Sequence, residues 1–530
     1  MITKAYERKM ETLGAFEVSS KMLAMAEVNE KHKTFLNAGR GNPNWINSIS
    51  RLAFAKLMEF GVEESKRTMD KGTLAGWIDG EGIEGRFDAY FKEPGEVNDF
   101  IRAAMDYAEK ELHLNRKEVI LEFENAIVGN NYPVPSRSLV NMEKIVNAYL
   151  EKTLYPGTGL AQHTRLFMVE GGTAAIVYIF DFLKHNGLLK EGDHIAINMP
   201  IFTPYILIPR LTNFQMTEIN VASSEDNDWE IPEEEMNKLL DPSVKAFFLV
   251  NPSNPGSHAF GKESLARFKK IMDQRKDLIV ITDDVYGSFV EGFESVYGEA
   301  PYNTVLVYSF SKLFGATGWR LGVIAVHDDN VFNALLAKLP EEEKKVLDSD
   351  YSIVTMEPRK MLMIDRFCAD SRSIGLYHTS GLSTPQQALM GLFSLTHLMA
   401  DGEDPYFKTA DEIVSARYHT LYSTLGIKED NSVTNAKYYT ILDVYKIAEQ
   451  KYDKDFRKYL EKNYEQIDFL LRMSDEEGVV LVEGLGFDAP SGTLRVSQAN
   501  LPDEAYKKIA NRILDLLKEY HDDYLKQKGE

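Results

Sequence analysis

A chain of 530 residues with 44% hydrophobic content is long enough for two domains that fold by burying apolar side chains. The 81 acidic residues outnumber the 60 basic ones and give a formal charge of −21, which disfavours nucleic acid and anionic membranes as partners because both bind basic surfaces. The chain has one cysteine, Cys368, no Cys/His cluster of zinc-site spacing and no apolar stretch suited to a signal peptide or membrane span, so we expect a soluble cytoplasmic protein without a metal.

Residues from about 50 to 125 are predicted to be mainly helical. We assign residues 1–60 to an N-terminal arm and part of a small domain, and residues 61–125 to a helical insertion. Apolar residues recur there with helical spacing between charged ones, as in EVNDFIRAAMDYAEKELHL.

Short apolar runs between Thr164 and Val326 predict a buried sheet. The runs are RLFMV (165–169), HIAINMP (194–200), AFFLV (246–250), LIVIT (278–282), TVLVYSF (304–310) and LGVIAV (321–326). Such continuous runs are typical of strands covered on both faces in a mostly parallel sheet, where ligands bind at the carboxyl ends of the strands. We assign residues 126–383 to a large domain that carries a charged helical insertion at 333–375.

Residues 384–530 are assigned to a C-terminal small domain of α+β type. From about Thr384 the segment STPQQALMGLFSLTHLMA predicts a long amphipathic helix, and YYTILDVY (438–445) a hairpin-like segment. The ending DEAYKKIANRILDLLKEYHDDYLKQ predicts a further amphipathic helix. The smaller domain is therefore expected to be built from both ends of the chain.

A lysine follows one of the predicted buried strands. The segment YSFSKLFGATGWRLG places Lys312 at the carboxyl edge of the sheet. Lysine is normally a solvated surface residue, so beside a sheet core its amine must have a use or a lowered pKa. Taken alone, the segment would more simply be a surface loop with two basic residues.

Other strands are also followed by residues suited to a ligand. The turn Glu170-Gly171-Gly172-Thr173 after RLFMV could bind a phosphate through free N–H groups and the dipole of the following helix. After HIAIN, Phe202 or Tyr205 could cover a planar ring. Each feature alone has an ordinary structural explanation as a tight turn or a core residue.

Two more strand ends carry amides and carboxylates. NPSNPG follows AFFLV, and its prolines could direct the amide of Asn251 or Asn254 inward. Asp283 and Asp284 follow LIVIT, and a carboxylate buried at a strand end needs a cationic partner such as a protonated ring nitrogen.

The motifs GGTAA, PIF, NPSNPG, DDVY and SFSKLFGATGWRLG, taken in this order, resemble the cofactor-contact motifs of the class I aminotransferases. The resemblance implies an α/β protein of PLP-dependent fold type I, the aspartate aminotransferase fold. In that fold a large domain with a mostly parallel sheet is joined to a smaller α+β domain. It also implies pyridoxal 5′-phosphate (PLP) as the cofactor.

The resemblance assigns roles around the cofactor ring. Lys312 carries PLP as a Schiff base and, once displaced by substrate, acts as general base and acid. Asp283 pairs with the ring nitrogen, Tyr286 and Asn254 hydrogen-bond the phenolic oxygen, and Phe202 stacks on the ring.

The resemblance also implies how the phosphate is held. The groups come from the glycine turn, the two serines before the lysine and the arginine eight residues after it: Gly172, Thr173, Ser309, Ser311 and Arg320. In this family a tyrosine from the neighbouring subunit reaches the phosphate, and Tyr132 in GNNYPVP is the candidate. At least a homodimer is therefore implied, and the resemblance suggests a larger assembly of dimers.

Substrate contacts are implied near both chain ends. Arg495 in GTLRVSQAN matches the arginine that binds the substrate α-carboxylate, with Asn254 beside it. In FLNAGRGNPNW, Gly39 is the candidate backbone contact, and Arg40 and Asn42 are candidate side-chain contacts.

Within the family, the long inserts, NAGRGNPNW and NPSNPG resemble the aspartate 4-decarboxylases, which convert L-aspartate to L-alanine and CO2. The nearest arginine before the HTSGLSTPQQ segment, Arg372, lies eleven residues before Ser383, so none stands at the step expected for a clamp on the distal carboxylate. A decarboxylase gains from this, because stabilising the leaving carboxylate in the ground state raises the barrier to its loss.

The resemblance to a decarboxylase implies L-aspartate as substrate, a secondary aminotransferase activity and pyruvate as a reactivating keto acid. A plain aminotransferase is the first alternative, although it would not need the inserts. A PLP-binding transcription regulator is the second, but it needs a basic helix-turn-helix domain, and the acidic N-terminal region offers none.

Overall fold

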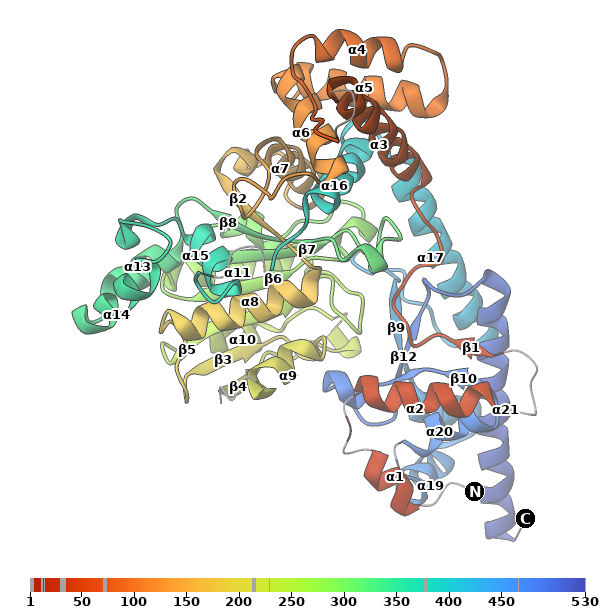
Figure 1. The fold of residues 1–530 in the computed structure, drawn as a ribbon. Coiled ribbons are helices and arrows are strands. Elements are labelled where there is room, and N and C mark those ends of the chain that lie inside the picture. Colours follow the sequence, from red (N-terminus) through yellow and green to blue (C-terminus); the bar gives the residue numbers. More distant parts are fainter. Residues whose placement is uncertain are drawn as a thin grey trace.

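The computed structural model describes residues 4–10, 13, 15–28, 35–69, 74–211, 216–227, 229–375, 380–465 and 467–529. Figure 1 shows a central sheet covered by helices, a group of helices above it and a smaller α/β part that holds both chain termini. Among the described residues, no helix combines the length and apolar character needed to cross a lipid bilayer.

The central sheet contains seven strands in the order β2-β8-β7-β6-β5-β3-β4. Their bounds are β2 (Thr164–Val169), β3 (His194–Ile197), β4 (Thr217–Asn220), β5 (Val244–Val250), β6 (Ile279–Asp283), β7 (Thr304–Ser309) and β8 (Gly322–His327). Only β8 runs antiparallel to its neighbours, so the predicted mostly parallel sheet is confirmed. Each of the six predicted runs overlaps one strand, whereas β4 was not predicted because this edge strand, TEIN, has no buried apolar run.

Helices cover both faces of the sheet (Figure 1). One face packs against α8, α9, α13 and α15, and the other against α7, α11, α12 and α16. The helices of this part are α7 (Val140–Leu154), α8 (Gly172–His185), α9 (Pro204–Leu211), α10 (Glu233–Met236), α11 (Lys262–Gln274), α12 (Val296–Glu299), α13 (Val331–Lys338), α14 (Glu341–Tyr351), α15 (Met363–Ser371) and α16 (Thr384–Leu398). The predicted helical character of 333–375 is therefore confirmed.

The upper helices share a core with α16. They are α3 (Ser48–Thr68), α4 (Ile83–Tyr90), α5 (Glu96–Lys110) and α6 (Arg116–Val128). The prediction that α16 is amphipathic was wrong, since residues on all sides of this helix are buried. The reason is tertiary, because α3, α6 and α7 all pack around it.

The smaller part joins both chain ends. It contains α1 (Lys4–Met10), α2 (Ala15–Glu27), β1 (Leu36–Asn37), α17 (Pro405–Leu425), β9 (Tyr439–Asp443), α18 (Val444–Lys451), α19 (Lys454–Asn463), α20 (Asp468–Asp475), β10 (Val479–Val480), β11 (Val482–Glu483), β12 (Thr493–Ser497) and α21 (Asp503–Lys528). One hydrophobic cluster joins Met10 and Leu36, near the N-terminus, to buried residues that lie between Tyr418 and Tyr524 in the C-terminal part of the chain. The predicted hairpin-like segment at 438–445 was wrong, because β9 pairs with the distant β12 and leads directly into α18.

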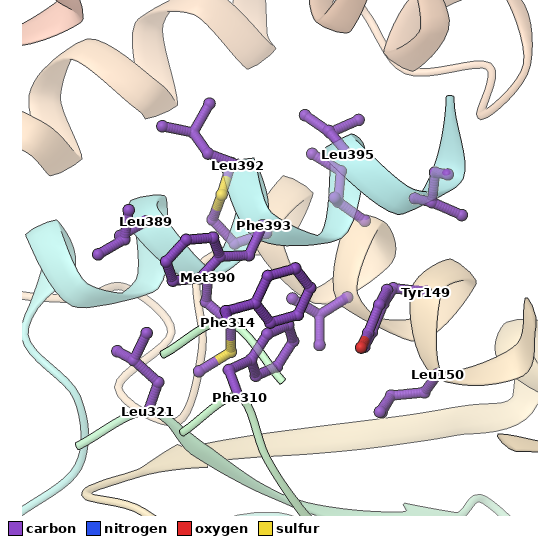
Figure 2. Packing of buried hydrophobic residues seen from close by; sticks show 14 of the residues in the cluster. Tyr149, Leu150, Phe310, Phe314, Leu321, Leu389, Met390, Leu392, Phe393 and Leu395 are labelled. Atoms are coloured by element: carbon purple, nitrogen blue, oxygen red, sulfur yellow. The ribbon is translucent and has the colours of Figure 1, made fainter. Parts of the chain in front are cut away.

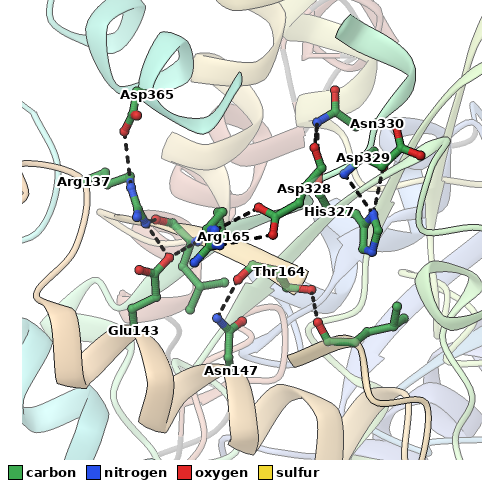
Figure 3. A network of polar contacts seen from close by, with 12 residues as sticks. Arg137, Glu143, Asn147, Thr164, Arg165, His327, Asp328, Asp329, Asn330 and Asp365 are labelled. Carbon is green, nitrogen blue, oxygen red and sulfur yellow. Dashed lines mark hydrogen bonds and ion pairs between the residues drawn. The ribbon is translucent and has the colours of Figure 1, made fainter. Parts of the chain in front are cut away.

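Polar contacts fix the edge of the sheet at β2 (Figure 3). Arg137 pairs with Glu143 of α7 and, at 3.2 Å, with Asp365 of α15. Arg165 of β2 pairs with Asp328, which follows β8, at 2.8 Å. Arg137 also donates to the Leu166 carbonyl at 2.9 Å, and Glu143 accepts from the Leu166 N–H at 2.8 Å, so these side chains bind backbone groups of β2 that would otherwise be open to pairing.

The turn that carries Lys312 rests on aromatic packing. Phe310 and Phe314 flank the turn, and Figure 2 shows them packed among α16 and α7 side chains. The ring centroids of Phe314 and Phe393 are 4.7 Å apart, and those of Phe310 and Tyr149 are 5.1 Å apart. The buried helix α16 therefore supports the position of the lysine.

Replacing Phe393 with alanine should lower the free energy of unfolding by about 3–5 kcal/mol, because the lost ring leaves a cavity in a well-packed core. Thermal or denaturant unfolding measures the change. The control is Val346→Ala on α14, since Val346 is 60% exposed and its loss should change stability by no more than about 0.5 kcal/mol. Unchanged stability in the Phe393 variant would contradict the supporting role of α16.

Candidate active site

A cavity of about 630 Å³ lies where the carboxyl ends of β5, β6 and β7 face the smaller part of the chain. Its walls come from the large sheet, from β9 and β12, and from the segment at 37–42. Of the residues predicted from the sequence, those that line it are Gly39, Arg40, Asn42, Gly172, Thr173, Phe202, Asn254, Asp283, Tyr286, Ser309, Ser311, Lys312, Arg320 and Arg495. Segments far apart in the sequence thus meet in one place.

Tyr132 lies outside the part of the cavity formed by its own chain. It is 71% exposed, on the loop between α6 and α7. The expected contact of this tyrosine with a neighbouring subunit stays a prediction.

Lys312 extends from the turn after β7 into the cavity. Its Nζ donates a hydrogen bond to the Gly41 carbonyl oxygen at 3.0 Å. Just before it, the Ser309 hydroxyl donates to the Leu321 carbonyl at 2.9 Å and lies within hydrogen-bond distance of Ser311 Oγ, at 2.8 Å. The hydrogen bond to Gly41 therefore orients the amine in the cavity that Ser309 and Ser311 also line.

The glycine turn and Arg320 form a cradle for an anion. A Cβ on Gly171, whose φ is +89°, would lie 2.6 Å from Arg320 Nη2, so only glycine lets the guanidinium approach this closely. Gly172 begins α8, and the first N–H groups of a helix have no partner within the helix. Free amides, a guanidinium and hydroxyls thus converge, as recognition of a phosphate requires.

Asp283 presents a buried carboxyl to the cavity at the end of β6 and is only 4% exposed. Its partners are neutral: the Tyr205 hydroxyl donates to it at 3.5 Å and the Val285 N–H at 3.3 Å. Burial raises the pKa of Asp283 to about 7, despite the opposing effects of these bonds and of Lys312. A cationic ligand group would stabilise its charged form.

For each pair of candidate residues that the sequence left open, the structure shows which residue lines the cavity. Asp284 does not line the cavity, because the Thr282 and Ser295 hydroxyls bind it inside the fold. Asn254 lines the cavity, whereas Asn251 accepts a hydrogen bond from the Phe260 N–H at 2.9 Å and shapes the loop.

The aromatic pair divides in the same way. Phe202 lines the cavity and packs against Val482 and Phe487, whereas Tyr205 is fully buried behind Asp283. Phe202 is therefore the ring available to a planar ligand.

Arg495 is a buried cation whose partners are neutral. Its Nη1 donates to Asn254 Oδ1 at 3.0 Å, its Nη2 donates to the Gly39 carbonyl at 2.8 Å, and its Nε has no hydrogen-bond partner. The guanidinium lies 4.2 Å from the centre of the Tyr439 ring. A guanidinium held in this way favours a carboxylate ligand, which would supply the missing charge.

Sequence reasoning missed Tyr439. This residue of β9 lines the cavity, and its hydroxyl accepts a hydrogen bond from the Tyr286 hydroxyl at 3.1 Å. Burial alone would raise the pKa of Tyr439, but the charges of Lys312 and Arg495 outweigh it and hold the pKa below its usual value. The alternation of side chains along YYTILDV could have shown that only one of its two tyrosines points inward.

Similarity to known proteins agrees with the chemistry of this site. Residues 129–513 match the family model of aminotransferase class I and II. The chain belongs to the class I and II aminotransferase family. A bifunctional aspartate aminotransferase and L-aspartate beta-decarboxylase from a Pseudomonas species is 42% identical over 98% of this chain and 98% of its own length.

Solved structures share the fold of this aminotransferase-family chain. The aspartate aminotransferase from Rhizobium meliloti superposes with a TM-score of 0.60 at 14% identity, covering 96% of both chains. The aspartate aminotransferase from Thermus thermophilus with maleate gives a TM-score of 0.57 at 17% identity, covering 97% of this chain and 98% of its own. The predicted aspartate aminotransferase fold is confirmed.

The cofactor of this aminotransferase family is PLP, and the cavity fits it. The anion cradle at Gly172 and Arg320 suits its phosphate, and the buried carboxyl of Asp283 suits a protonated ring nitrogen. The Lys312 amine lies in the same cavity. In the part of the chain that the structure describes, no group of three or more His, Cys, Asp or Glu side chains could hold a metal ion.

The pKa of Asp283 predicts how the stability of the cofactor-free protein depends on pH. The folded protein holds this proton to about pH 7, whereas an unfolded aspartate loses it near pH 4. Stability should therefore fall as pH rises through this window, by roughly 4 kcal/mol at most for three pKa units.

The test compares thermal midpoints at pH 5 and pH 8 for the cofactor-free wild type and Asp283→Asn. The variant should show a smaller decrease between these pH values because it cannot ionise at this position. Some decrease should persist, since burial also raises the pKa of Asp284, to about 8. Equal decreases in both proteins would refute the assigned environment of Asp283.

Proposed function

We propose that this protein removes the β-carboxylate of L-aspartate as CO2 and produces L-alanine, with aspartate aminotransferase as a secondary activity. The observation that carries the proposal is the 42% identity to a protein named for both activities. This similarity extends over 98% of the chain and therefore includes residues 61–125 and 333–375, which we predict to be insertions, as well as the cofactor site.

The residues around the cavity would hold PLP. The phosphate would be bound by Gly172, Thr173, Ser309, Ser311 and Arg320, with Tyr132 contributed by a second subunit. Asp283 would pair with the ring nitrogen, Tyr286 and Asn254 with the phenolic oxygen, and Phe202 would cover the ring. When bound, PLP supplies a ring that accepts the negative charge developing on the substrate.

Arg495 would bind the substrate α-carboxylate. Its free Nε and its fork of N–H groups are already oriented by Asn254 and Gly39, so little side-chain entropy is lost when a carboxylate arrives. The two parallel hydrogen bonds of an arginine with a carboxylate would fix the amino acid in one orientation.

Lys312 would move the protons. Its amine would take the proton from Cα and return it, because Nζ lines the cavity and is oriented by its hydrogen bond to Gly41. Loss of CO2 breaks the bond between Cβ and the carboxylate, and the electron pair left at Cβ then takes up a proton.

The β-carboxylate needs to be oriented without being held strongly. Arg40 lines the cavity but is exposed, so its interaction with a carboxylate would be weakened by solvent. We assign the orientation of the β-carboxylate to Arg40.

Pyruvate is the keto acid expected to restore activity lost through occasional transamination.

Aminotransferase as the main activity is the alternative, and the fold shared with aspartate aminotransferases favours it. Both functions use Lys312 and Arg495 in the same way, so product analysis has to decide between them.

We further propose a cytoplasmic homodimer or a larger assembly of dimers, in which the exposed Tyr132 reaches a neighbouring cavity.

L-Aspartate labelled with carbon-13 at C4 distinguishes the two functions. The purified holoenzyme should release labelled CO2 and form unlabelled alanine without a keto-acid acceptor in each turnover. Nuclear magnetic resonance and mass spectrometry of the products measure both. Label found only in oxaloacetate, and only when 2-oxoglutarate is added, would identify an aminotransferase instead.

Arg495→Lys should raise the KM for L-aspartate by roughly 10- to 100-fold, because a single ammonium cannot copy the two hydrogen bonds of the guanidinium. Steady-state kinetics measures the change. The matched control is Arg165→Lys, whose ion pair with Asp328 lies at the sheet edge outside the cavity, and its KM should be unchanged. An unchanged KM in Arg495→Lys would remove this residue from the substrate site.

A further inference from the structure

Tyr438 directly precedes strand β9 and Tyr439 begins it, and the two tyrosines have different environments. Tyr438 donates to the Gly41 carbonyl at 2.8 Å and does not line the cavity. Tyr439 is 2% exposed, lines the cavity and is the residue that sequence reasoning did not single out. The function proposed above does not yet use its hydroxyl.

The Tyr439 hydroxyl lies next to the amine of Lys312. A Cβ placed on Gly41 would be 2.0 Å from Tyr439 Oη and 3.1 Å from Lys312 Nζ, so both atoms border the same point. The Lys312 amine is close enough for its charge to lower the pKa of Tyr439, and the Tyr286 hydroxyl donates to the phenol oxygen at 3.1 Å. Tyr439 therefore connects the lysine to a second phenol.

Charge around the phenol favours exchange of its proton. The Arg495 guanidinium lies 4.2 Å from the ring centroid, and Lys312 Nζ and the Tyr439 hydroxyl both border Gly41. Two cations beside a buried phenol stabilise its ionised form and so make the hydroxyl a better acid than an ordinary tyrosine. The groups that face Tyr439 are these two cations and the neutral phenols of Tyr286 and Tyr438.

Decarboxylation at Cβ has a proton requirement that transamination lacks. L-Aspartate carries one net negative charge at neutral pH and L-alanine none, so each turnover consumes one proton from solvent. The bond from Cβ to the carboxylate breaks, CO2 leaves, and the electron pair forms a new C–H bond at Cβ. An aminotransferase exchanges protons at Cα and places none on Cβ.

We propose that Tyr439 is the proton partner of Lys312 in the decarboxylation, acting as a positioning residue for the amine and as the source of its proton. This inference rests on the proposed function. When Lys312 gives a proton to the substrate, the Tyr439 hydroxyl returns one to the amine and is left as the phenolate. The phenolate takes up a proton from solvent after alanine leaves, which closes the proton balance.

Tyr439→Phe isolates this role. The substitution removes only the hydroxyl and keeps the ring beneath Arg495, so the α-carboxylate site is preserved. The control is Tyr149→Phe, because Tyr149 is equally buried and its hydroxyl is paired with that of Tyr308 at 2.7 Å outside the cavity. Both variants lose one hydroxyl from a buried tyrosine pair, so a general loss of stability affects both.

Three measurements on the holoenzymes test the proposal. First, kcat for alanine formation should fall about tenfold or more in Tyr439→Phe, whereas KM and aminotransfer to 2-oxoglutarate change much less. Second, the decline of decarboxylation at high pH should disappear or shift in this variant, because a proton donor loses activity as pH rises through its pKa. Third, the pH titration of the cofactor's visible absorption, measured without substrate, should shift because Tyr286 loses its phenol partner.

The control variant should match the wild type in all three measurements. An equal loss of both activities with unchanged pH behaviour would reduce Tyr439 to a structural residue and overturn the proposal. Full decarboxylation in Tyr439→Phe would also overturn it. If the wild type formed no alanine, the proposed function itself would be refuted. This outcome is distinguishable from failure of the Tyr439 proposal, because it appears in the wild type before any substitution is made.

Discussion

The buried carboxyl of Asp283 is the constraint on which the arrangement of the cavity depends. A carboxyl at the end of β6 with only neutral partners is unfavourable as an anion, which is why its pKa rises to about 7. A cationic ring nitrogen would remove this penalty, so the electrostatics of the sheet edge already favours one orientation of the cofactor. The hydroxyl of Tyr205 and the backbone of Val285 keep the carboxyl directed toward that position.

The opposite side of the cavity holds cations with neutral partners. Arg495 is oriented by Asn254 and Gly39, and Lys312 by Gly41, each through oxygen atoms without a formal charge. Because no carboxylate neutralises them at these hydrogen bonds, the cations remain available to an anionic substrate. A ligand that carries both a cationic and an anionic group would therefore compensate the groups of this cavity.

The cavity also depends on elements that supply no ligand contact. Helix α16 packs through Phe393 against Phe314 and so supports the turn of Lys312. Arg137 pairs with Asp365 of α15 and donates to the Leu166 carbonyl, so it links α15 to the sheet edge at β2. Residues 333–375, which we predict to be an insertion, are therefore joined to the sheet that carries the lysine.

The sequence by itself determined the parallel sheet, the order of the strand-end motifs and the family, because apolar runs and the spacing of short motifs are local properties. Only the tertiary structure decided that α16 is buried on all sides, that β9 pairs with the distant β12, and that Asp283 rather than Asp284 lines the cavity. It also placed Tyr439 beside Lys312. These outcomes depend on which surfaces meet after the chain ends join, and no local pattern of residues records that.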